Sequence, residues 1–202
     1  MPSPIPIDDF GARIATVWSE LRPSTRGLVE RALQAPVTQA TRNFQYDARA
    51  DLELSRFLAA LDDRAAEKSE ALDAETCSRL KSVADTCASV LQEQTESAEV
   101  FAQLVRRASN QRDYKRIDIL ADALNSRFPT SEICELARSE DQIVRELANE
   151  ALARCPIAVL AVLLNDPVDA ETARAALRRQ VIEYGSEEAR MIVNGIDPGD
   201  EF

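Results

Sequence analysis

Apolar residues recur along most of this chain at intervals of three and four, the period of an amphipathic α-helix, rather than at the interval of two that marks a strand. From about residue 97 onward the apolar series become shorter and their connections tighter. The chain is therefore expected to be all-α. In the first half the pattern predicts a loop over 37–46 and helices over 8–21, 24–35, 47–72 and 74–94.

Polar residues and glycine place several helix boundaries. Asp73 is expected to cap the helix that follows it, because its carboxylate can accept a hydrogen bond from an unpaired N–H group of the first turn. Ser139 and Gln142 fit a capping box, and Asp166 followed by proline predicts another helix start. Gly185 is expected to end a helix in the left-handed conformation.

Two further features predict burial. Residues 157–164 are all apolar, so the helix expected there has no polar side and should be covered by its neighbours. Cys77 and Cys87 fall on the apolar stripe of the helix over 74–94. Both thiols are expected in the core, where a thiol stays protonated and unreactive.

The second half carries an approximate internal repeat of about 27 residues. The segment 120–129 recurs as 147–156, with Leu-Ala near the start and Pro at the end of each copy, and two helices fit within one repeat. A helical pair of this size cannot cover its own apolar side, so it must stack on the next pair. The same shift relates Ile133 and Leu136 to Leu160 and Leu163.

Residues 136–152 carry a leucine, an acidic turn, Val144-Arg145, then alanines and Ala151-Leu152, and this order resembles a HEAT repeat. The resemblance covers about residues 97–184, and its period is similar to that of compact bacterial HEAT-like repeats. It implies a right-handed α-α superhelix of helical hairpins. It also implies that Arg145 braces a turn and pairs with an acidic residue of the adjacent repeat, such as Asp166.

Three regions follow from these patterns. Residues 1–96 form an N-terminal helical region, with two short helices and then a longer hairpin, and resemble no family. Residues 97–196 form the HEAT-like repeat region. Residues 197–202 are an acidic tail.

Composition excludes several kinds of catalytic site. The chain has only 5 glycines, with none between Gly27 and Gly185, so it lacks the glycine-rich loops that cradle phosphates. It contains no histidine, which excludes imidazole catalysis and histidine-containing metal sites. Its four cysteines form no CxxC pair. We therefore expect no cofactor and no metal.

Net charge limits the partners. The formal charge is −11, whereas a protein that neutralises phosphates needs a basic face, so neither nucleic acid nor a membrane is expected as a partner. The local exception is five basic residues between Arg106 and Arg116, which are expected to form a solvated helix junction. The chain starts with no secretory signal pattern and has no apolar run of membrane-spanning length. We expect a cytoplasmic protein.

The resemblance implies a binding protein, since most HEAT-like proteins bind other macromolecules. The diiron hydroxylases of this fold use histidine ligands, and the alkylpurine glycosylases use a basic, aromatic groove; this chain has neither. We therefore expect a non-enzymatic adaptor that binds a protein or peptide on the concave surface lined by the second helix of each pair. The candidate partner-binding residues are Asp118, Asp122, Arg145, Asn149, Arg174 and Arg178.

Two alternatives stay open. A carboxylate-dependent hydrolase would need a pair of acidic residues, one with a raised pKa. The pairs are Asp118 with Asp122, Asp62 with Asp63, and Glu187 with Glu188. The other alternative is a structural subunit of a homo-oligomer, in which the hairpin of the helices over 47–72 and 74–94 forms a homodimer through its apolar stripe.

Overall fold

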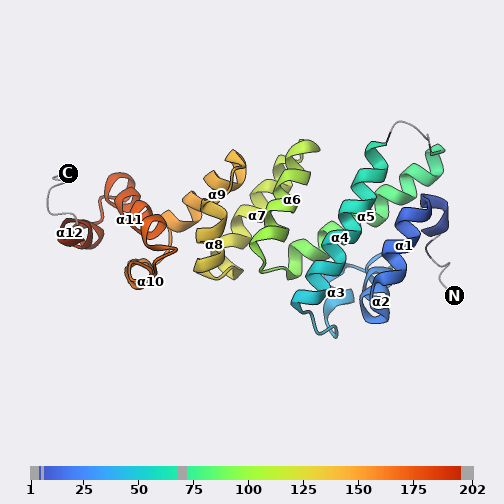
Figure 1. Ribbon diagram of the computed structural model, residues 1–202, viewed down its shortest axis with the longest axis horizontal. Coiled ribbons are helices and arrows are strands. Elements are labelled where there is room, and N and C mark those ends of the chain that lie inside the picture. Colours follow the sequence, from blue (N-terminus) through green and yellow to red (C-terminus); the bar gives the residue numbers. More distant parts are fainter. Residues whose placement is uncertain (1–4, 6, 68–71, 197–202) are drawn as a thin grey trace. The chain divides into compact units, whose positions relative to one another are not determined.

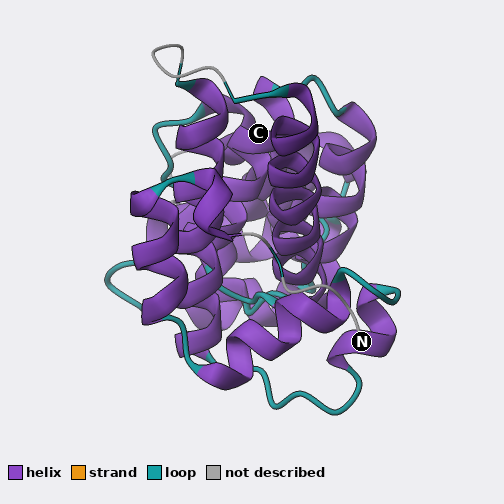
Figure 2. Ribbon diagram, turned by 90° about the vertical axis from the view of Figure 1, so that its right-hand side faces the viewer, coloured by secondary structure: helices purple, strands orange, loops and turns teal. Residues whose placement is uncertain are grey.

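The computed structural model describes residue 5 and residues 7–67 and 72–196, and within these ranges the chain is helical with no strand. Figure 2 shows helices joined by short loops throughout this part. The all-α prediction is confirmed. Contacts divide the chain into two compact units, residues 1–95 and 96–202, which we call unit 1 and unit 2.

Unit 1 is built around its two longest helices, which pack against each other and carry many of its fully buried side chains. Phe57 is fully buried on the first of them, and its ring lies 5.1 Å from the ring of Trp18. The elements of unit 1 are a 3₁₀ helix η1 (Ile7–Phe10), α1 (Ala12–Glu20), α2 (Pro23–Ala32), α3 (Val37–Thr41), α4 (Ala48–Ala66) and α5 (Ala74–Gln94).

Two predicted boundaries in unit 1 are wrong. The helix predicted over 8–21 is broken at Gly11, whose φ of 110° is accessible mainly to glycine, so η1 and α1 are separate. The predicted loop over 37–46 contains the short helix α3, which begins directly after Pro36. The end of the helix predicted over 47–72 falls partly on residues 68–71, outside the described residues.

The apolar stripe proposed for homodimerisation is buried inside unit 1. On α4 and α5 it packs between the two helices and against α1, α2 and α3. A second copy could reach this stripe only if unit 1 unfolded, so the stripe is a core and not a docking surface. Its fully covered side chains include Leu54, Phe57, Leu58, Leu61, Leu80 and Leu91.

Unit 2 consists of helices shorter than α4 and α5, and they pack in neighbouring pairs (Figure 1). Short turns join the helices of each pair, which lie side by side. The elements of unit 2 are α6 (Ala98–Asn110), α7 (Tyr114–Arg127), α8 (Thr130–Ala137), α9 (Gln142–Ala153), α10 (Ile157–Leu163), α11 (Ala170–Tyr184) and α12 (Glu187–Ile196).

Within unit 2 the pairs follow one another in layers. The first pair, α6 and α7, contacts the second through α6 with α8 and α7 with α9. The second pair contacts the third through α8 and α9, both of which pack against α11, and α12 covers α10 and α11. This order is compatible with a helical repeat. No helix in the described part of the chain is both long enough and apolar enough to cross a membrane.

The helix boundaries follow the capping predictions in part. Asp73 caps α5 by accepting a hydrogen bond from Thr76 N–H at 2.8 Å, and Gly185 ends α11 in the left-handed conformation, as predicted. The capping box at Ser139 is wrong. Asp141 caps α9 instead, by accepting from the N–H groups of Ile143 and Val144, while Ser139 Oγ accepts from Asp141 N–H.

Two predictions of burial are also wrong. In α10 only Leu160 is fully buried, and Val162 is 71% exposed, because the helix has neighbours on only part of its circumference. Cys77 is exposed near the start of α5, whereas Cys87 is fully buried as expected. An apolar residue on these helices is therefore buried only where a neighbouring helix packs against it.

Polar contacts reinforce the stack between layers. Arg138, after α8, donates to the Asp169 carboxylate at 2.7 Å, and Asp169 lies at the start of α11 with its side chain only 8% exposed. Gln180 of α11 is buried and donates to the carbonyl oxygen of Cys155 at 2.8 Å. Both contacts join the second pair of helices to the third.

We predict that Arg138→Ala destabilises the protein by about 1–3 kcal/mol, because it leaves the Asp169 carboxylate buried without its cation. The measurement is the free energy of unfolding in urea. Arg13→Ala is the matched control: it breaks an ion pair with Asp63 in which both side chains are more than half exposed, and should cost less than about 1 kcal/mol. Equal effects of the two variants would contradict the bracing role.

Candidate functional site

The six candidate residues lie on α7, α9 and α11, the second helices of three successive pairs. These helices pack in a row, α7 against α9 and α9 against α11. Each helix turns its apolar stripe inward, as with Leu120 on α7, Ala148 on α9 and Leu177 on α11, all fully buried. The polar candidates lie outside these stripes.

On α7 the candidates reach the surface. Asp118 and Asp122 are both exposed and lie one helical turn apart. They are accompanied by two large apolar side chains, Tyr114 at 68% and Ile119 at 53% exposure. This helix therefore presents two carboxylates beside an aromatic and an aliphatic side chain.

On α9 the candidates are half-buried, and one of them has a structural role. Arg145 donates to the carbonyl oxygens of Ser139 at 2.7 Å and Glu140 at 3.3 Å, so it braces the turn that precedes its own helix. Asp166, its expected partner in the adjacent repeat, instead accepts from the N–H groups of Val168 and Asp169. The brace acts within one repeat.

On α11 the two arginine candidates are half-buried and make contacts within the protein. Arg174 pairs with Glu171 at 2.6 Å. Arg179, the residue after Arg178, donates to Glu150 of α9 at 2.7 Å and to Glu183 of α11 at 2.7 Å. The hydrogen bond to Glu183, within α11, leads the interactions that raise the pKa of Arg179, and the hydrogen bond to Glu150 joins α9 to α11.

Sequence reasoning missed the exposed apolar side chains of the same three helices. Adjacent pairs of large apolar residues could have indicated their exposure: Ile119 is next to Leu120, and Ile182 is next to Val181. Consecutive residues of a helix point about 100° apart, so both members cannot lie at the centre of one buried stripe. The exposed set is Tyr114, Ile119, Ile143, Ile182 and Tyr184.

We call the exposed residues of this row the α7–α9–α11 face. Its exposed members include Tyr114, Asp118, Ile119, Asp122, Ile143 and Ile182.

The carboxylate pairs considered for catalysis do not line either of two hollows on the surface of unit 1. Asp118, Asp122, Glu187 and Glu188 are exposed, and Asp63 pairs with Arg13. One hollow lies between η1, α1 and α4, and the other lies along α5; each is lined by a single carboxylate. Neither brings together the two acidic groups that acid and base catalysis needs.

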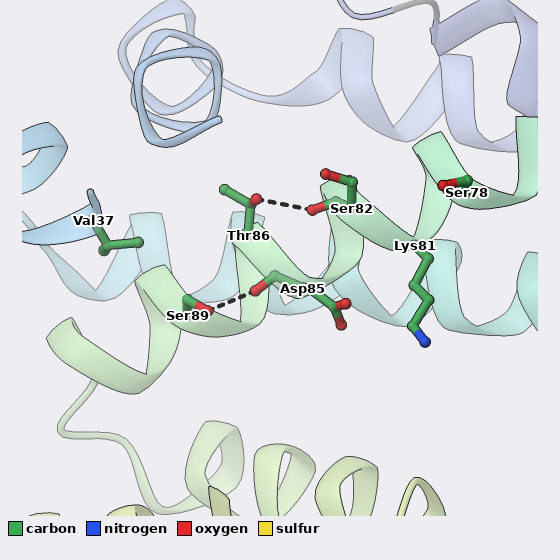
Figure 3. A pocket seen from close by; sticks show the side chains of 7 residues that line it. All are labelled: Val37, Ser78, Lys81, Ser82, Asp85, Thr86 and Ser89. Atoms are coloured by element: carbon green, nitrogen blue, oxygen red, sulfur yellow. Dashed lines mark hydrogen bonds between the residues drawn. The ribbon is translucent and has the colours of Figure 1, made fainter. Parts of the chain in front are cut away.

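The hollow along α5 is wide and shallow, about 410 Å³, and its lining is mostly hydroxyl-bearing (Figure 3). The hydroxyls of Thr86 and Ser89 turn back on the helix and donate to the carbonyl oxygens of Ser82 and Asp85. These two hydroxyls are engaged with the backbone rather than directed at a common point.

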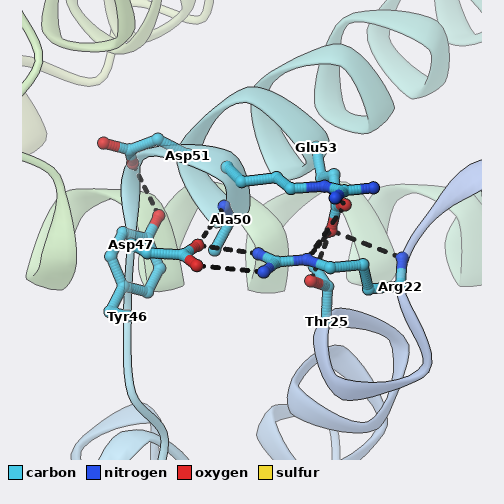
Figure 4. A network of polar contacts seen from close by, with 8 residues as sticks. Arg22, Thr25, Tyr46, Asp47, Ala50, Asp51 and Glu53 are labelled. Carbon is cyan, nitrogen blue, oxygen red and sulfur yellow. Dashed lines mark hydrogen bonds and ion pairs between the residues drawn. The ribbon is translucent and has the colours of Figure 1, made fainter.

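The densest polar network of unit 1 joins the starts of α2 and α4 (Figure 4). Arg22 donates to both oxygens of Asp47, at 2.9 and 2.7 Å, and to Glu53. Burial favours a raised pKa for Glu53, but hydrogen bonds from Thr25 and Arg22 outweigh it and the pKa lies below its usual value. Asp47 also caps α4 through Ala50 N–H. The network holds two helix starts together.

Thiol chemistry has little support in unit 2. Burial raises the pKa of Cys134 to about 12 and also raises the pKa of Cys155, so both thiols stay protonated at neutral pH. Within the described residues, no group of three histidine, cysteine or acidic side chains is placed to hold a metal ion.

Comparison of the chain with family models, with curated proteins and with solved structures gives no match.

The Arg22 network generates a prediction about pH. Hydrogen bonds from Arg22 lower the pKa of Asp47 from 3.8 to about 2, so this carboxylate stabilises the fold fully above about pH 4 and loses its effect as the pH falls toward 2. Asp47→Asn keeps a capping side chain but removes the charge. We expect the variant to be less stable at pH 7 and to approach the wild type near pH 2.

The measurement is the denaturation midpoint at several pH values between 7 and 2. Asp63→Asn is the control and should change the midpoint little, since its ion pair with Arg13 is largely exposed. A difference between Asp47→Asn and wild type that stays constant over this range would contradict the assignment.

Proposed function

We propose that this protein is a non-enzymatic interaction module that binds a protein or peptide partner on the α7–α9–α11 face. The helical pairs of unit 2 would be HEAT-like repeats wound as a right-handed superhelix, with this face on the concave side. One observation carries the proposal. Three consecutive second helices each expose a large apolar side chain, and on α7 the exposed carboxylates Asp118 and Asp122 accompany them.

Exposed apolar side chains favour an interface on energetic grounds. Leaving Tyr114, Ile119 and Ile182 in water forgoes the gain of burial, roughly 1.5–3 kcal/mol for a large apolar side chain. Interfaces typically place such residues in their centre and polar groups around them. The α7–α9–α11 face has this mixed composition.

The charges of the face constrain the partner. On α7 the exposed charges next to the apolar side chains include Asp118 and Asp122, whereas the candidates of α11 are arginines. A partner would therefore place basic groups beside Asp118 and Asp122 and would contact α11 chiefly through apolar groups, because Arg174 is already paired with Glu171. Complementary charge contributes to specificity and to the rate of association, and both effects weaken in salt.

The structure also directs the choice of variants. Arg145 braces a turn and Arg174 pairs with Glu171, so reversing these charges would disturb the fold as well as any interface. Asp122, Ile119 and Ile182 are exposed and can be changed with less risk.

We predict that Ile119→Glu, Ile182→Glu and Asp122→Arg each weaken capture of a cellular partner at least tenfold, since they place a charge in the interface or reverse one. The measurement is quantitative mass spectrometry of proteins retained by the immobilised protein at two salt concentrations. Leu52→Glu is the matched control, because Leu52 has a similar exposure on α4 of unit 1.

Unchanged thermal melting would show that the variants fold. Retention of every captured protein by all three variants, at wild-type levels, would overturn the proposal. Equal losses with Leu52→Glu would also overturn it.

A further inference from the structure

The turn between α6 and α7 concentrates positive charge in a chain whose net charge is −11. Between residues 106 and 116 there are five basic residues and one acidic residue, Asp113. Arg107 is buried and donates to Gln111 at 3.3 Å, so it serves the fold. The other four basic residues reach the surface, and we call them the α6–α7 basic turn: Arg106, Arg112, Lys115 and Arg116.

Arg112 has a backbone conformation that disfavours its own side chain. Its φ is 56°, and among the described residues it is the only one other than glycine with a positive φ. This conformation ends α6: Arg112 N–H donates to the carbonyl oxygen of Ser109 at 3.0 Å, and the next N–H donates to that of Ala108 at 2.9 Å. Gly185 holds the corresponding position at the end of α11. An arginine is less stable there than a glycine, because its Cβ crowds the following carbonyl oxygen.

Two cations of the basic turn lie at the start of α7, where they oppose the helix dipole. Lys115 and Arg116 are in the first turn, which has no acidic residue, although the positive end of a helix favours acidic side chains. Asp113 offsets this in part, because its carboxylate accepts from Arg116 N–H at 3.1 Å. Counted from the N-cap of each helix, α9 has apolar residues at these two positions and α11 has Glu171 and Thr172. The helical pairs therefore do not require cations here.

The unfavourable features of residues 112–116 have no full compensation inside the protein. In the described part of the chain, neither the Arg112 guanidinium nor the Lys115 ammonium takes part in an ion pair or a hydrogen bond. Strained backbone and local choices that lower stability without an internal gain are concentrated at functional sites. The basic turn is therefore a candidate binding site for an anionic group.

The charges around the turn constrain the partner. Asp118 and Asp122 are exposed on the next two turns of α7, roughly 5 and 10 Å along the helix axis from Lys115. The Debye length at physiological salt is about 8 Å, so an anion spread over this region experiences both carboxylates. A nucleic acid strand or an anionic lipid surface would cover them together with the turn and would be repelled. A short peptide segment can place a few carboxylates on the turn alone.

We propose that the α6–α7 basic turn binds a short acidic segment of a partner protein, a run of Asp and Glu residues. Arg112 binds a carboxylate through two parallel hydrogen bonds, and Lys115 adds a second charged contact. Tyr114, between them in sequence and 68% exposed, can donate its hydroxyl to a carboxylate. Exposed ion pairs are weak, so we expect a dissociation constant on the order of 100 μM at low salt and weaker binding at high salt.

This site is distinct from the α7–α9–α11 face, although Tyr114 belongs to both. Ile182→Gln alters that face without changing the charge, and it should leave the binding of an acidic peptide unchanged. The two proposals therefore fail separately, because one is tested by capture of a partner on apolar side chains and the other by binding of a defined peptide to cations.

Fluorescence anisotropy of a fluorescein-labelled peptide that alternates Glu with Ser, titrated with the full chain, tests the proposal. Arg112→Gly should weaken binding about threefold, because it removes one exposed ion pair. It should also raise the melting temperature by about 2–4 °C, because glycine relieves the strained conformation. Weaker binding by a more stable protein cannot be caused by unfolding. Arg112→Lys keeps the charge and should bind within about twofold of the wild type.

Lys115→Glu reverses a charge and should weaken binding about tenfold, and an acidic residue at a helix start is compatible with the fold. Lys81→Glu is the matched control, the same substitution at an exposed lysine of unit 1, and should weaken binding less than about twofold.

A wild type that does not bind the peptide would overturn the proposal, as would wild-type binding by both Arg112→Gly and Lys115→Glu. An equal loss with Lys81→Glu would show that only the net charge matters and would also overturn it. Equal affinity for a peptide that alternates Gln with Ser, or tighter binding of a single-stranded oligonucleotide of the same charge, would contradict the assignment to an acidic protein segment.

Discussion

The structure of unit 2 depends on one constraint: a pair of short helices cannot bury its own apolar stripes and must use the next pair to do so. The contacts of α6 with α8, of α7 with α9, and of α9 with α11 satisfy this constraint layer by layer. Small residues help, because the fully buried Ala148 and Ala173 let neighbouring helices approach closely. Stacking therefore brings α7, α9 and α11 into one row, and the proposed binding face follows from that row.

The same constraint explains where polar contacts occur. Ion pairs such as Arg138 with Asp169 and Arg179 with Glu150 join successive layers. The Arg145 contact is of another kind, because it fixes a turn within one repeat. In unit 1, Arg22 has the corresponding task of holding the starts of α2 and α4 together. The charged side chains with the most internal contacts therefore serve the fold, and exposed groups such as Asp118 remain available for a partner.

Periodicity predicted the all-α fold and most helices, because each layer repeats the same inward stripe, as with Leu120, Ala148 and Leu177. It failed where the outcome depends on neighbours that are distant in sequence. Val162 is apolar like a core residue, but among the described residues no helix covers it, and it is 71% exposed. Ser139 and Asp141 are both able to cap α9, and the turn geometry selects Asp141. The candidate polar residues could be assigned to their helices from the repeat, whereas the carbonyl groups bound by Arg145 and the exposure of Ile119 required the three-dimensional structure.

Hydrogen exchange of backbone amides, resolved by residue in the intact chain, tests most directly whether unit 2 is held by contacts between successive layers. If it is, protection should be greatest in α8 and α9, which have neighbouring pairs on both sides, and should fall through α11 to α12, which closes the series. Equal protection of all helices in unit 2, or greatest protection in α12, would show that the layers do not depend on one another in this order.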